Sequence, residues 1–152
     1  MTTLVPLTEL EKLQDYAYAR RISIFLSYRP SECKGFCMRI GAGRGVTINK
    51  CSITSEADEL CTLAEELGHI ETGTVLPAGD YVDPYYKRYL KRHNENRAHW
   101  DAIQRLLPPE KLQDAVDIGH RSVSGIAGYC GVTAEFAEAA ILYYERKGYE
   151  FE

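Results

Sequence analysis

The segment Glu65-Glu66-Leu67-Gly68-His69 brings together three side chains that suit hydrolytic chemistry. On a helix, Glu65 and His69 lie one turn apart on the same face, with Glu66 beside them. Zinc peptidases use this layout: ligands at i and i+4 hold the ion, and a Glu between them takes a proton from water. The usual residues are His-Glu-x-x-His, and Glu65 stands at the first His. Because carboxylates also ligate zinc, at about 2.0–2.2 Å, a metal site remains possible.

A competing interpretation is that these polar residues are only the solvated face of an amphipathic helix. The same segment supplies an apolar stripe on its other side, made of Leu60, Leu63, Ala64 and Leu67. Spacing alone therefore does not decide between the two interpretations. Gly68 favours a close neighbour, because a glycine inside a helix costs about 1 kcal/mol and often marks a close backbone approach.

A second helix carries a further carboxylate, Glu95, at the head of an otherwise apolar stripe. The stripe continues with Ala98, Ala102, Ile103 and Leu106, and its alanines permit close approach of another helix. A buried carboxylate needs a partner, and a metal ion is an adequate one. Glu95 is therefore a candidate third ligand, and His99 is a possible additional ligand. The alternatives are a rim position for Glu95 and a packing role for His99.

The two segments together resemble the ImmA/IrrE-type metallopeptidases. Residues 62–69 are similar to that family's T-L-A-H-E-L-G-H helix, and residues 94–102 are similar to its E-x-x-A-D-x-x-A helix. The resemblance extends over most of the chain, from about residue 7 to residue 148. It implies a zinc-dependent hydrolase with a zincin-type helix pair.

Carried over position by position, the resemblance makes His69 and Glu95 metal ligands and Glu66 the catalytic base. Glu65 takes the place of the first His ligand, and His99 takes the place of an Asp. The implied cofactor is Zn²⁺. A site of two carboxylates and one imidazole would be formally neutral, so its water would be less acidic than at a site of two imidazoles and one carboxylate. We therefore expect Glu65 to reduce metal binding and activity.

The resemblance also implies a partner, because members of this family act on a helix-turn-helix transcriptional repressor and thereby induce a prophage or mobile element. One alternative is a catalytically dead pseudo-peptidase that binds such a regulator without cutting it. Another is a nucleic-acid-binding regulator that uses a basic segment interleaved with tyrosines, namely Tyr85, Tyr86, Lys87, Arg88, Tyr89, Lys91, Arg92 and Arg97. The net charge of −4 argues against direct nucleic-acid binding.

Composition indicates an ordinary globular protein. Its 152 residues are 45% hydrophobic and 26% charged, which is enough to bury one core. The five cysteines are an odd number, and the first residues carry neither a basic nor an apolar run, so we expect no secretory signal, free thiols and a cytoplasmic location. No apolar run reaches the length of a membrane span.

Local patterns predict an α+β fold with a helix, a small antiparallel sheet and a helical half, and the resemblance implies that the sheet packs on the zincin-type helix pair. A glycine-rich hairpin turn at 41–45 separates two of the strands. The expected helices are 8–20, 55–70, 85–107, 110–119, 123–129 and 133–147, and the expected strands are 22–28, 35–40 and 46–49. A loop covers 74–84. Pro108-Pro109 divides a metallopeptidase-like domain, residues 1–107, from a C-terminal helical segment, residues 108–152.

Overall fold

The computed structural model describes residues 5–30, 32–73 and 84–152. Its elements are, in order, α1 (Glu9–Ala19), β1 (Ile22–Ser27), β2 (Gly35–Ile40), β3 (Gly43–Asn49), the 3-10 turn η1 (Lys50–Ser52), α2 (Glu56–Glu71), α3 (Pro84–Leu106), α4 (Pro109–Ile118), α5 (Val123–Cys130) and α6 (Ala134–Arg146). Residues 74–83 of the loop predicted at 74–84 lie outside the described residues, and residue 84 begins α3. The side chains of residues 84–91, which hold most of the predicted basic segment, are also outside the description.

Helix ends follow local capping chemistry, as predicted. At the start of α1 the Thr8 hydroxyl accepts the Glu11 N–H at 3.1 Å, and the Glu11 carboxylate accepts the Thr8 N–H at 3.3 Å. Ser55 and Thr133 cap α2 and α6 through their hydroxyls, which accept the N–H groups of Asp58 and Phe136. Gly131 ends α5 with φ of +74°, a conformation that glycine adopts without strain. The predicted helices are confirmed, with ends that shift by one or two residues.

The sheet is mixed, so the prediction of an antiparallel sheet is wrong for one of its two strand pairs. The strand order is β1-β3-β2, in which β2 and β3 form the predicted hairpin and β1 pairs with β3 in parallel. β3 takes the centre because it is the most buried strand, with Gly45 to Asn49 all buried. With β3 in the centre, β1 pairs with β3, and the two strands run in the same direction.

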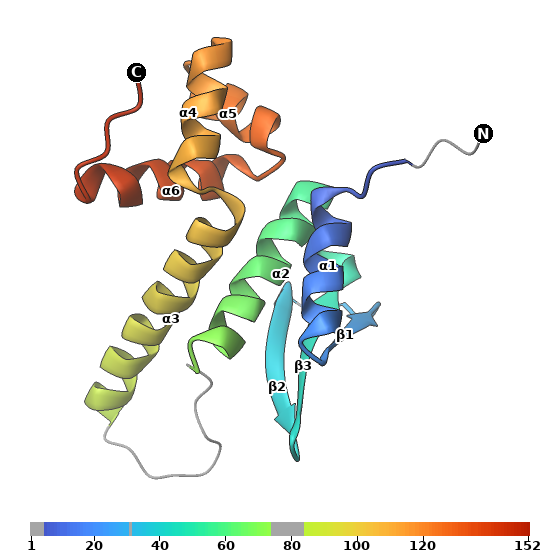
Figure 1. Ribbon diagram of the computed structural model, residues 1–152. Helices are drawn as coiled ribbons and strands as arrows, with labels where there is room; N and C mark the ends of the chain where they lie inside the picture. Colours follow the sequence, from blue (N-terminus) through green and yellow to red (C-terminus); the bar gives the residue numbers. More distant parts are fainter. Residues whose placement is uncertain (1–4, 31, 74–83) are drawn as a thin grey trace.

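α2 is the centre of the molecule. Figure 1 shows α3 along one side of α2, with α1 and the sheet on the other side, and α4–α6 gathered beyond the end of α3. Leu63, Leu67 and Ile103 are each about 1% exposed or less, so the core lies along both sides of α2. The C-terminal helices join this core through the Tyr144 hydroxyl, which donates to the Leu107 carbonyl at 2.7 Å.

Two further sequence-based expectations concern the setting of the protein. All five cysteines lie in the described residues and are present as thiols. Among the helices of residues 5–30, 32–73 and 84–152, none is long and apolar enough to cross a membrane.

Asp58 ties the start of α2 to the approach to β2. It is 5% exposed, and its carboxylate accepts from the Lys34 ammonium at 2.9 Å and from the Thr54 N–H at 3.0 Å. Burial alone would raise the pKa of Asp58, but these hydrogen bonds outweigh burial and lower it. The folded chain therefore holds this proton less tightly than the unfolded chain does.

We expect Asp58→Asn to lower the free energy of unfolding at pH 7 by about 1–2 kcal/mol, a value discounted because Lys34 is half exposed. The contribution of Asp58 is present above the unfolded pKa of about 4 and is lost as the pH falls through the lower folded pKa. Urea denaturation at pH 7 and pH 3 should show the variant losing less stability than the parent chain. The exposed Asp114→Asn is the control, and an equal acid loss in Asp58→Asn would contradict the expectation.

Candidate functional site

α2 and α3 cross in close contact at Gly68 and Ala98. A Cβ atom placed on Gly68 would lie 2.3 Å from the Ala98 carbonyl oxygen, so only glycine fits at this point. Glu65 and His69 flank Gly68 on α2, and Glu95 and His99 flank Ala98 on α3. Backbone contact at the crossing therefore brings the polar side chains of the two helices face to face.

Two histidine–carboxylate pairs bridge the helices. His69 Nε2 lies 3.2 Å from Glu95 Oε2, and His99 Nδ1 lies 3.0 Å from Glu65 Oε1. In each pair a ring nitrogen faces a carboxylate oxygen, and these two groups are complementary hydrogen-bond partners. The pairs border a pocket of about 220 Å³ whose lining is Glu65, Glu66, His69, Glu95, Asn96, Ala98 and His99. All five residues that the sequence selected thus share one pocket.

Exposure distinguishes the members of this pocket. The His69 side chain is 15% exposed, so the interpretation of this helix face as merely solvated does not hold for it. The Glu95 side chain is 58% exposed, which is the rim position left open by the sequence. His99 packs edge-on against Phe136 of α6, with ring centroids 5.7 Å apart. The C-terminal segment therefore helps to position one side of the pocket.

Glu66 is the most buried carboxylate of the pocket, and its surroundings perturb it. Burial raises the pKa of Glu66, and the negative charges of Glu95 and Glu65 add to the rise, whereas His69 opposes it. A carboxylate with a raised pKa is a stronger proton acceptor once it is ionised.

Cys37, on β2, is a neighbour of Glu66 that sequence reasoning missed. Burial, together with the Glu66 charge, raises the pKa of the Cys37 thiol to about 11, so the thiol stays protonated at neutral pH. The alternation of side chains along β2 predicts the face of the sheet on which Cys37 lies, but it does not predict which helix covers that face.

The donor types suit zinc, but their arrangement does not form the predicted ligand set. Two ligands of one tetrahedral zinc ion lie about 3.3 Å apart, close to the separation within each cross-helix pair. In the described part of the chain, however, no group of three or more His, Cys, Asp or Glu residues is placed to hold a metal ion. In each pair the ring nitrogen and the carboxylate oxygen that face each other are already bonded to one another, so neither pair, as it stands, offers both of its facing donor atoms to a metal ion.

The described residues define an α+β protein with a small three-stranded mixed sheet and a polar pocket at a helix crossing. Comparison of the chain with protein-family models, with curated proteins and with solved structures gives no match.

Proposed function

We propose that this chain is a metallopeptidase-like protein of the ImmA/IrrE kind, in which α2 and α3 form a zincin-type helix pair, and that it acts on a helix-turn-helix transcriptional repressor. The observation that carries the proposal is the α2–α3 crossing. It unites His69 with Glu95, 26 positions away, in the pocket that also contains Glu66. The five cysteine thiols support a reducing, cytoplasmic setting.

Within this proposal Glu66 is the catalytic base. Its burial and raised pKa suit it to take a proton from a water molecule in the pocket. The two cross-helix pairs act as positioning groups, because each bond fixes the orientation of an imidazole ring against the opposite helix. The proposal assigns these roles to the side chains as they stand.

A second candidate is a binding protein that sequesters the repressor without cutting it. The cross-helix bonds favour it, because they engage one ring nitrogen and one carboxylate oxygen of each pair that a metal could otherwise use. The lack of a three-donor group among the described residues favours it as well. On this candidate the pairs lock α2 to α3 and preserve the shape of the partner surface.

The proposal is tested by incubating the purified protein with a purified helix-turn-helix repressor and following cleavage of the repressor, with the zinc content of the protein measured in parallel. We expect Glu66→Gln to slow cleavage about 100-fold or more, because it removes the base. Glu56→Gln, an exposed change at the start of the same helix, should leave the rate unchanged. A stable complex in which neither the native chain nor Glu66→Gln cleaves the bound repressor would establish the non-cleaving candidate.

The fold of the Glu66→Gln variant provides an internal check. Because the pKa of Glu66 is raised in the folded chain, its ionised form destabilises the fold above that pKa. Glu66→Gln should therefore melt at the same or a higher temperature at pH 7. A lost rate together with an undiminished melting temperature assigns the loss to chemistry and not to unfolding.

A further inference from the structure

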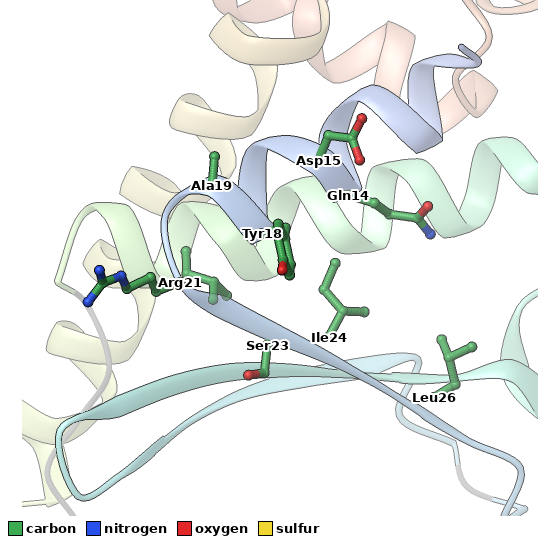
Figure 2. Close-up of a pocket in the computed structure, with 9 residues that line it drawn as sticks. Gln14, Asp15, Tyr18, Ala19, Arg21, Ser23, Ile24 and Leu26 are labelled. Carbon is green, nitrogen blue, oxygen red and sulfur yellow. The ribbon is translucent and has the colours of Figure 1, made fainter.

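A second, larger hollow lies between α1 and β1, away from the candidate site. Its volume is about 830 Å³, and Tyr18, Arg21, Ser23 and Ile24 are among the residues that line it. Figure 2 shows α1 along one wall of this groove and β1 along the other. β1 is at the opposite edge of the sheet from β2, the strand that carries Cys37.

The groove exposes the backbone edge of β1. Within the described residues, β3 is the one strand that pairs with β1, so the outer N–H and C=O groups of β1 have no strand partner there. Ser23 and Ile24, which point to opposite faces of a strand, both line the groove. The groove therefore reaches the hydrogen-bonding edge itself. Over its six residues, β1 offers an edge of roughly 20 Å.

Native edge strands are blunted by charges, proline, bulges or a covering element. Within Ile22–Ser27 the described strand contains no charged residue and no proline that would hinder pairing with another chain. Here Leu26 is 50% exposed and Tyr18, across the groove, is 84% exposed. Exposed side chains on both walls of the groove can receive the alternating side chains of an added strand.

Arg21 adopts a backbone conformation that is unfavourable for arginine. It follows the end of α1 with φ of +59°, a left-handed conformation in which glycine is favoured. In the described part of the chain its guanidinium makes no ion pair or hydrogen bond, and neither does the Asp15 carboxylate on α1. Both side chains line the groove, so they are available to charged groups of a ligand.

We propose that this groove binds an extended segment of a partner polypeptide as a fourth strand beside β1. The segment carries an acidic residue where it meets Arg21 and a basic residue where it meets Asp15, and its apolar side chains alternate between Tyr18 and Leu26. Main-chain hydrogen bonds to β1 supply affinity, and the two charges select sequence. This inference goes beyond the proposed peptidase-like function and does not depend on the α2–α3 pocket.

The probe is a fluorescein-labelled peptide of alternating valine and threonine, with aspartate at one end and a central lysine. We expect saturable binding to the full chain by fluorescence anisotropy, together with slower hydrogen exchange of the β1 amides. A matched peptide with proline at the centre should not bind, because it cannot complete the strand pairing.

Arg21→Gly gives two readouts of opposite sign. Peptide affinity should fall about tenfold, because the charged partner of the aspartate is removed. The melting temperature should rise, because glycine relieves the left-handed backbone. Arg29→Gly, just beyond β1, removes an exposed arginine of the same type and should leave peptide affinity unchanged.

Three results would overturn the proposal. One is undiminished peptide affinity in Arg21→Gly. Another is protection, in the free monomer, of those β1 amides that are not bonded to β3. The third is a dimer in sedimentation equilibrium in which these same amides are protected without peptide, which would make a second copy of the chain the occupant.

Discussion

Replacing Gly68 by alanine is expected to lower the free energy of unfolding by about 2 kcal/mol or more. The new Cβ would lie 2.3 Å from the Ala98 carbonyl oxygen and 3.0 Å from its carbonyl carbon, and a backbone cannot rotate aside as a side chain can. Forcing the helices apart costs about 3 kcal/mol or more, at the upper end of the usual overpacking range because the contact is with backbone, and the better helix propensity of alanine returns about 1 kcal/mol. Urea denaturation followed by circular dichroism measures the difference.

Gly128→Ala is the matched control for this change. Gly128 also lies inside a helix, α5, but a Cβ there would meet nothing within 4 Å. This variant should gain up to about 1 kcal/mol from helix propensity alone. The two glycine-to-alanine changes should thus shift stability in opposite directions. Equal stability of Gly68→Ala and the parent chain would show that the helices do not cross where the candidate site requires it.

The helices and the crossing were predictable because their signals are local. Thr8 with Glu11 marks the start of α1 through hydrogen bonds within four residues, and these bonds form as the spacing predicts. Gly68 and Ala98 were expected to permit close approach, and each lies at the contact. Helical period then determines which side chains flank that contact. For this reason Glu65 and His69 meet Glu95 and His99.

Strand neighbours were not predictable, because pairing depends on contacts that are distant in sequence. The alternation of 22–28 indicates a strand and its faces, but it does not state whether β2 or β3 lies beside it. The parallel pairing of β1 with β3 follows from the burial of β3, which only the assembled core reveals.

Partner choice within the pocket was hidden for a similar reason. Spacing places four donors on facing helices, but side-chain rotamers decide that Glu65 bonds to His99 and that His69 bonds to Glu95. Cys37 reaches the neighbourhood of Glu66 only through the packing of β2 on α2. Neither fact is encoded by the spacing of residues along one element.

Glu65→His is expected to tighten zinc binding at least tenfold. The change gives α2 two imidazoles, at i and i+4. Imidazole is a better zinc donor here than a second carboxylate, because the carboxylate also lowers the net positive charge of the site. It also removes the carboxylate that accepts the His99 hydrogen bond at 3.0 Å, so one cross-helix pair no longer competes. A tenfold change corresponds to about 1.4 kcal/mol, well within the reach of competitive chelator titration.

Repressor cleavage should rise together with zinc affinity in Glu65→His, because a more positive site lowers the pKa of water and each 1.4 kcal/mol is about tenfold in rate. Glu65→Gln is the matched control, since it removes the charge without adding an imidazole, and it should gain neither property. Glu65→His combined with Glu66→Gln should keep the zinc and lose the cleavage.

The possible outcomes separate the candidate functions. If the native chain binds zinc and cleaves as well as Glu65→His, Glu65 is a competent ligand and the expected weakness is wrong. If neither chain holds zinc or cleaves the repressor, the non-cleaving candidate stands. Zinc without cleavage would direct attention to His99, which stands where the ImmA/IrrE motif has Asp. The double variant Glu65→His, His99→Asp should then restore the rate, because a carboxylate at position 99 accepts a hydrogen bond from a ligand imidazole and orients it.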